Sequence, residues 1–125
     1  MADSLVLVVE DEAMIRLVLM EEFEDAGFRV AEADSADAAV ALLAGGAPVL
    51  AVVTDVRMPG SMDGLGLAAW MREHRPTVPV FVTSGYATRP DAAAINPAIA
   101  AVVPKPYQPS DLVALVANRT ASRPA

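Results

Sequence analysis

The feature that most constrains the fold is a set of short apolar runs in which polar and apolar residues do not alternate. Leu5–Val9 and Val49–Thr54 are the clearest of these runs, and both are rich in valine and leucine. A strand with one face in water alternates, whereas a strand covered on both faces is apolar throughout, as in a parallel sheet. We therefore expect central strands of a parallel sheet.

Five expected strands, of which Phe28–Ala33 is half-alternating as in an outer strand, alternate with segments that carry helical spacing or helix-end signals. The expected strands are Leu5–Val9, Phe28–Ala33, Val49–Thr54, Val78–Thr83 and Ile99–Val103. The expected helices are Ala13–Ala26 with Gly27 beyond its end, Ala36–Ala44 capped by Asp34 or Ser35, Leu65–His74 capped by Asp63, a proline-interrupted segment within 84–97, and Leu112–Asn118 capped by Ser110. Short right-handed crossovers then predict an α/β protein, with one five-stranded parallel sheet flanked by five helices. Residues 1–125 are expected to form one domain, ordered over about 4–119.

Composition narrows the class of protein. Hydrophobic residues make up 54% of the 125 residues and charged residues 20%, which favours a compact chain over a disordered one. The absence of cysteine excludes disulfides and cysteine metal sites. The net charge of −7 argues against nucleic acid or an anionic membrane as a partner. There is no apolar run of about 18 residues and no basic leader at the N-terminus, so we expect a cytoplasmic protein without a membrane span.

Ionisable and hydroxyl side chains stand where the expected strands end. Glu10 and Asp11 follow the first strand, Asp55 ends the third, Thr83 ends the fourth and Lys105 follows the fifth. The carboxyl ends of parallel strands meet at one edge of a sheet, where open α/β proteins bind ligands. Three carboxylates there repel one another, and a hard cation with oxygen ligands, such as Mg²⁺, relieves the repulsion. Because a lysine and a threonine beside them can hold phosphate oxygens, the group is suited to carrying a phosphoryl group on a carboxylate.

Five short motifs, in their order and spacing, give the chain a specific resemblance. They are Val8–Glu12, Thr54–Pro59, Met62–Gly64, Thr83–Ser84 and Pro104–Pro106. Together they resemble the receiver domain of two-component response regulators, a CheY-like family, over essentially the whole chain. The resemblance implies a doubly wound, flavodoxin-like sheet with strand order 2-1-3-4-5 and a phosphoprotein that acts in phosphorelay signalling.

The resemblance also implies a role for each matching residue. Asp55 would be the phosphoacceptor, which attacks a phosphohistidine on a sensor histidine kinase or phosphotransfer protein. Glu10, Asp11 and Asp55 would bind Mg²⁺ or Mn²⁺ together with the backbone carbonyl of Arg57. Such a protein receives a phosphoryl group and releases it to water, and we do not expect a turnover enzyme.

Other implied features concern the transmission of the signal. Thr83 and Lys105 would contact the phosphoryl group, and the Lys105–Pro106 peptide bond would be cis. The surface formed by the fourth helix, the fifth strand and the fifth helix would bind an unknown downstream protein. The chain would be a monomer or a weak, phosphorylation-dependent dimer.

The chain departs from the common family pattern at three places, one of which is the proline-interrupted fourth helix. The Met58–Gly64 loop is one residue longer than the commonest form, which affects the approach to the phosphate. Val102 stands where the family often has an aromatic residue on the fifth strand, and Tyr86 could take over its part. We therefore expect Thr83, Tyr86 and Val102 at the switch.

Alternatives remain open at this point. One is a phosphatase with an aspartyl nucleophile. Members of the best-known such family carry a second acid two residues after the nucleophile, and Arg57 at that position argues against this class. A receiver-like interaction module that is never phosphorylated is disfavoured because Asp55, Thr83 and Lys105 are all present. A stand-alone regulator, a phosphate sink and a receiver excised from a hybrid histidine kinase are not separated by the sequence. The only histidine, His74, is expected at a solvated helix end and not as a phosphodonor.

Overall fold

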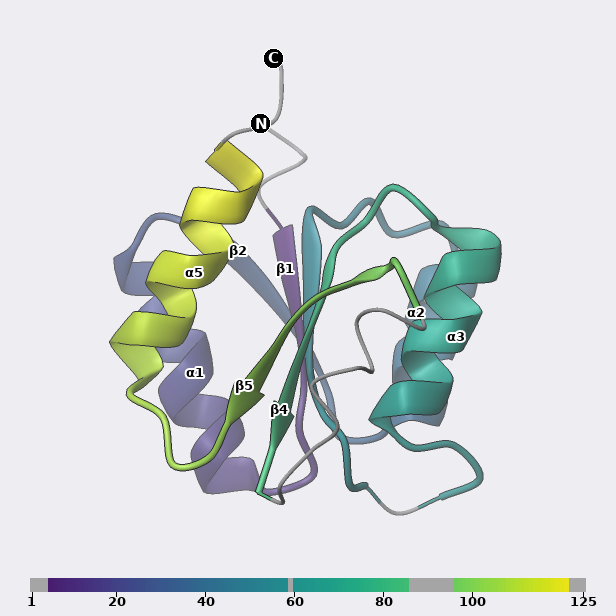
Figure 1. The fold of residues 1–125 in the computed structure, drawn as a ribbon, viewed down its shortest axis with the longest axis horizontal. Helices are drawn as coiled ribbons and strands as arrows, with labels where there is room; N and C mark the ends of the chain where they lie inside the picture. Colours follow the sequence, from purple (N-terminus) through teal and green to yellow (C-terminus); the bar gives the residue numbers. More distant parts are fainter. Residues whose placement is uncertain (1–4, 59, 86–95, 122–125) are drawn as a thin grey trace.

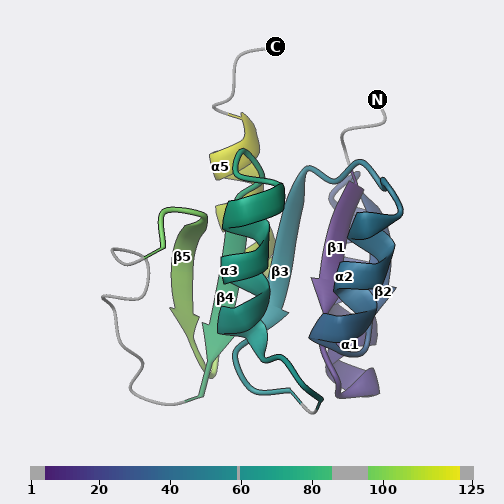
Figure 2. The same ribbon diagram turned by 90° about the vertical axis from the view of Figure 1, so that its right-hand side faces the viewer.

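The computed structural model describes residues 5–58, 60–85 and 96–121. Within them, five parallel strands form one sheet in the order β2-β1-β3-β4-β5 (Figure 1). The strands are β1 (Leu5–Val9), β2 (Arg29–Ala33), β3 (Ala51–Asp55), β4 (Val80–Ser84) and β5 (Ile99–Pro104). Figure 2 shows β5, β4, β3 and β1 side by side with their arrows pointing the same way. The predicted parallel sheet and its strand order are confirmed.

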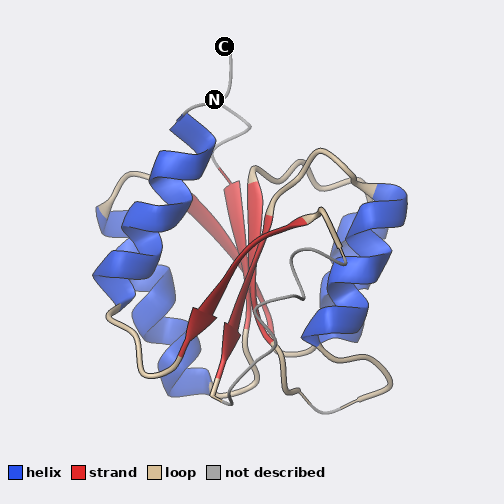
Figure 3. Ribbon diagram, in the orientation of Figure 1, coloured by secondary structure: helices blue, strands red, loops and turns tan. Residues whose placement is uncertain are grey.

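Helices cover both faces of the sheet. They are α1 (Ala13–Asp25), α2 (Ala36–Ala44), α3 (Gly64–His74) and α5 (Pro109–Ala121). α1 and α5 lie against one face, and α2 and α3 lie against the other (Figure 3). The helix that we predicted within 84–97 falls largely outside the described residues, so the described part of the chain contains four helices where five were predicted. In that same part, no helix is long and apolar enough to cross a bilayer.

The central strands are apolar throughout because they face two separate hydrophobic cores. Val6 and Val8 of β1 pack in one core with Phe23 of α1. Leu7 and Val9 point to the other core, which α2 and α3 close. Successive side chains of a strand point to opposite faces, so a strand between two cores cannot alternate. This is the physical reason why the non-alternating runs predicted the strands correctly.

Two of the predicted helix caps are present in the structure. The Ser35 hydroxyl accepts a hydrogen bond from the Ala38 N–H at 3.0 Å at the start of α2. The Asp63 carboxylate accepts one from the Gly66 N–H at 2.8 Å at the start of α3. These bonds satisfy backbone donors that the first helical turn leaves without partners. They also fix where the chain leaves the loops at the carboxyl edge of the sheet.

The predicted start of the last helix was wrong. Ser110 was expected as the N-cap, but α5 begins at Pro109, and the Gln108 carbonyl accepts the Asp111 N–H at 2.9 Å. Proline fits the first helical position because its missing N–H would have no intrahelical partner there. The helix also continues to Ala121, beyond the predicted end.

Two methionines on helices provide a matched test of this packing. Met71 of α3 is fully buried, whereas Met14 of α1 is 74% exposed. Met71→Ala is expected to lower the free energy of unfolding by about 2–5 kcal/mol, because it removes buried apolar atoms and leaves a cavity. Met14→Ala is expected to change it by about 0.5 kcal/mol or less. Urea unfolding measures both, and equal effects would contradict the assignment of Met71 to the core.

Candidate functional site

The strand ends at one edge of the sheet bring the predicted site residues together. Asp55 at the end of β3 pairs in register with Thr83 of β4. Backbone hydrogen bonds continue just beyond the strands: the Glu10 N–H donates to the last residue of β2 at 3.0 Å, and the Lys105 N–H donates to the last residue of β4 at 2.7 Å. The residues that follow β1 and β5 are therefore held as firmly as the strands themselves.

Three carboxylates form a cluster at this edge. Glu10, Asp11 and Asp55 each offer an oxygen, and these oxygens lie within 4.8 Å of one another. Glu10 is 2% exposed and Asp55 is 8% exposed, whereas Asp11 is open to solvent. An all-oxygen donor set with one open side suits a hard divalent cation that keeps some of its water. The residues present therefore fit the divalent cation that the sequence predicted.

Burial and crowding perturb one member of this cluster strongly. The pKa of Glu10 is raised to about 7, first because the side chain is buried, and further because Asp55 and Asp11 lie close by. A hydrogen bond from the Glu12 N–H at 3.0 Å and the charge of Lys105 oppose the shift but do not cancel it. Ionising Glu10 is therefore costly unless a positive charge lies nearby, and a bound cation would supply that charge.

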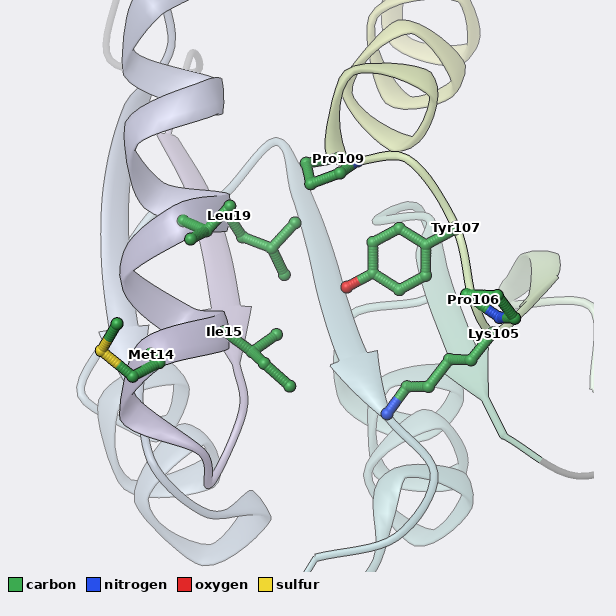
Figure 4. Close-up of a pocket in the computed structure, with 8 residues that line it drawn as sticks. Met14, Ile15, Leu19, Lys105, Pro106, Tyr107 and Pro109 are labelled. Carbon is green, nitrogen blue, oxygen red and sulfur yellow. The ribbon is translucent and has the colours of Figure 1, made fainter.

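Lys105 supplies the positive charge of the site. Its Nζ donates a hydrogen bond to Asp55 Oδ2 at 2.8 Å, and both side chains are largely buried. Figure 4 shows the extended side chain of Lys105, with its nitrogen far from the backbone of the β5–α5 connection. The Lys105–Pro106 peptide bond is cis, as the resemblance implies. An ammonium held against one carboxylate oxygen is placed to contact a group attached to that carboxylate.

Thr83 and the loop after β3 border the cluster. Thr83 is 2% exposed, and its carbonyl accepts the Val56 N–H at 3.0 Å, which joins β4 to the start of the loop. Arg57, Asp11 and two further residues of the loop line an open cavity of about 480 Å³. A cavity at this place leaves room for a ligand to reach the carboxylates from solvent.

The expected switch residues are placed only in part. Tyr86 lies outside the described residues. Val102 pairs with Val82 in the sheet and packs against the core on the α2 and α3 side. The position on β5 that often carries an aromatic residue in the family thus carries the aliphatic side chain of Val102.

Two residues near the cluster were missed by the sequence reasoning. Arg16 of α1 donates from Nη1 to the Glu10 carbonyl at 2.8 Å and forms an ion pair with Glu32 of β2 at 2.8 Å. The pKa of Tyr107 is raised to about 12 by burial and by the charges of Glu10 and Asp55. Arg16 stands six residues after Glu10, a spacing that could have indicated its contact with the acidic pair, whereas the apolar positions of the helix carry no sign of it.

An apolar groove adjoins the site on the side of α1. It has a volume of about 540 Å³ and lies between α1 and the β5–α5 connection (Figure 4). Its lining comprises Met14, Ile15, Val18, Leu19, Lys105, Pro106, Tyr107 and Pro109. Because Lys105 lines this groove and also contacts Asp55, the groove leads directly to the carboxylate cluster.

The raised pKa of Glu10 makes a prediction for the metal-free protein. The folded state keeps a proton on Glu10 that the unfolded chain releases above its ordinary pKa of 4.5. The stability that this proton provides is present below that pH and is lost as the pH rises through about 7. Glu10→Gln should therefore gain stability over the unaltered protein between pH 5 and 8, on the order of 1–3 kcal/mol.

Urea unfolding in EDTA at several pH values measures this difference. Glu21 is exposed on the surface of α1, so Glu21→Gln controls for the loss of one negative charge. A stability difference for Glu10→Gln that does not vary with pH would contradict the account of this cluster.

Comparison with known proteins places these features in a family. A family profile described as the response regulator receiver domain matches residues 6–117. A putative response regulator NtrX-like protein of Rickettsia bellii is 35% identical over 113 residues, which cover 89% of this chain and 23% of the relative. The chain thus spans about a quarter of the length of that relative.

Solved structures agree. A response regulator receiver protein from Sinorhizobium medicae matches with a TM-score of 0.85 and 30% identity, covering 98% of each chain. The response regulator protein TrrA from Thermotoga maritima, crystallised in complex with Mg²⁺ and beryllofluoride, matches with a TM-score of 0.80 and 27% identity, covering 91% of this chain and 96% of that one.

Proposed function

The chain belongs to the response regulator receiver domain family, and from that premise we propose that Asp55 accepts a phosphoryl group from a phosphohistidine of a histidine kinase or phosphotransfer protein. The observation that supports this most is the place of the Asp55 carboxylate. It ends a buried strand, shares a cluster with Glu10 and Asp11, and contacts Lys105 at 2.8 Å. Each of these neighbours has a part in the transfer.

In the proposed transfer, one oxygen of Asp55 attacks the phosphorus atom of the phosphohistidine. A P–O bond forms as the P–N bond breaks, and the electron pair of the P–N bond stays on the imidazole nitrogen. Lys105 Nζ, now bound to Asp55 Oδ2, can contact an oxygen of the new phosphoryl group as a point charge. Thr83, buried in register beside Asp55, supplies a hydroxyl donor on the same edge.

Glu10, Asp11 and Asp55 would hold Mg²⁺, with the backbone carbonyl of Arg57 as a further ligand. The ion would supply positive charge that offsets the carboxylates and the incoming phosphoryl oxygens. The three acids meet the requirement for oxygen ligands within reach of one another. TrrA, whose structure contains Mg²⁺ and beryllofluoride, supports this choice of ion.

The apolar groove beside α1 is the proposed seat of the phosphodonor. Met14 is 74% exposed, Leu17 51% and Val18 43%, all on the α1 face next to the groove. Exposed apolar side chains of this size on one helix face mark an interaction surface. A helix of a phosphodonor protein seated there would lie next to Lys105, and thus next to Asp55.

The alternatives fit the site less well. Arg57 lines the cavity at the position where the best-known phosphatases with an aspartyl nucleophile carry a second acid. A module that is never phosphorylated would have no use for a lysine held at 2.8 Å from the acceptor carboxylate. We therefore propose a protein that is phosphorylated and slowly loses the group to water, and whose output is a protein contact.

Direct labelling tests the proposal. With Mg²⁺ and acetyl phosphate, the chain should gain one phosphoryl group at Asp55, seen by mass spectrometry of the intact protein and of its peptides. Asp55→Asn should remove the labelling, because an amide is not a nucleophile of the same kind. Asp25→Asn, at the exposed end of α1, should label normally. Labelling of Asp55→Asn to the same extent as the unaltered protein would refute the assignment.

A further inference from the structure

The loop that follows β3 is tied to α2 by a single carboxylate. Asp37, in the first turn of α2, accepts a hydrogen bond on Oδ1 from the Ser61 hydroxyl at 2.8 Å. Its Oδ2 accepts a second hydrogen bond from the Ser61 N–H at 3.2 Å. We call this pair of hydrogen bonds the Asp37 latch. It joins residues that are 24 positions apart in the sequence.

The residue before Ser61 is shaped to the same carboxylate. Gly60 has a φ of 108°, a conformation that side chains other than glycine rarely adopt. A Cβ atom at Gly60 would lie 2.8 Å from Asp37 Oδ2, closer than such atoms approach in real structures. The tip of the loop therefore lies directly against Asp37: the positive φ favours glycine at this position, and a Cβ atom there would push the Asp37 carboxylate aside.

The same loop forms one side of the candidate site. Its first residues, Arg57 and Met58, line the 480 Å³ cavity together with Asp11. Its base is closed where the Gly64 N–H donates to the Val56 carbonyl at 2.8 Å. The base is thus fixed by the sheet and by α3, and the Asp37 latch fixes the tip from the other side.

We propose that Asp37 is a positioning residue for the metal site: the latch holds Gly60 and Ser61, at the tip of the loop, so that the Arg57 carbonyl at the start of the loop can join the carboxylates around Mg²⁺. The inference rests on the function proposed above. A loop held only at its base has more conformations to lose when one of its carbonyls becomes a ligand. A latch that orders the loop beforehand removes part of that cost from metal binding.

Asp37 could also attract Mg²⁺ simply by its charge, and the chain allows the two effects to be separated. Ser61→Ala removes one hydrogen bond of the latch and changes no charge. Asp37→Asn removes the charge but keeps one oxygen that can accept from Ser61. Asp34 is an exposed acid next to the start of α2, so Asp34→Ala is the matched control for the loss of a negative charge.

The experiment is calorimetric titration of Mg²⁺ into the unphosphorylated full chain. Asp37→Ala should weaken Mg²⁺ binding by about tenfold, at the lower end of the effects of residues that orient a ligand from outside the coordination sphere. Ser61→Ala should also weaken Mg²⁺ binding. The Mg²⁺ affinity of Asp37→Asn should lie between that of Asp37→Ala and that of the unaltered chain. The double variant Asp37→Ala/Ser61→Ala should bind Mg²⁺ no more weakly than Asp37→Ala alone. Amide exchange at Ser61 should be faster in Asp37→Ala, because its N–H loses its acceptor.

Two results would overturn the proposal. One is an effect of Asp37→Ala no larger than that of Asp34→Ala, and the other is normal affinity in Ser61→Ala. Acetyl phosphate labelling of the same variants at saturating Mg²⁺ keeps this inference separate from the proposed function. If all of them label at Asp55 and share one Mg²⁺ affinity, the latch proposal fails and the function stands; if the unaltered chain does not label at Asp55, the proposed function fails.

Discussion

Repulsion among three carboxylates at one edge of the sheet is the constraint on which the rest of the site depends. The oxygens of Glu10, Asp11 and Asp55 lie within 4.8 Å of one another, and burial of Glu10 and Asp55 leaves little water to screen these two. Two features reduce this repulsion. Lys105 contacts the Asp55 carboxylate at 2.8 Å, and the pKa of Glu10 is raised to about 7, so that Glu10 keeps its proton below that pH. Neither feature balances the negative charge of the cluster, so a divalent cation would be needed there, and its charge would also offset that of the proposed phosphoryl group.

The parallel sheet makes this crowding possible without loss of stability elsewhere. Strands buried between two cores fix the backbone up to their last residues, so the acids are held in place by packing that lies outside the site. The loops at the carboxyl edge are then fixed by individual contacts. Arg16 holds the carbonyl of Glu10, and Asp37 holds the tip of the loop that begins at Arg57. The hydrophobic cores stabilise the sheet, and these few polar contacts position the loops of the site.

The strands and the residues at their ends could be predicted from short-range patterns in the sequence, and the order of the strands from the resemblance that the family motifs carry. The composition of Leu5–Val9 alone predicts a strand that is buried on both faces. The prediction that Ser110 caps the last helix was wrong because the helix begins one residue earlier, at Pro109, which has no N–H that needs a cap. The Asp37 latch and the Arg16–Glu32 ion pair could not be predicted, since each joins segments whose approach is decided by the packing of a helix on the sheet.

The central claim is that Asp55 and the carboxylates beside it form one site for a phosphoryl group and a divalent cation. Fluorine NMR of the chain with beryllofluoride, an analogue of the phosphoryl group, tests this directly. We expect bound fluorine signals that require Mg²⁺ and that disappear in Asp55→Asn, because the carboxylate oxygen and the cation both contact the analogue. Bound signals of equal intensity without Mg²⁺, or in Asp55→Asn, would contradict the account.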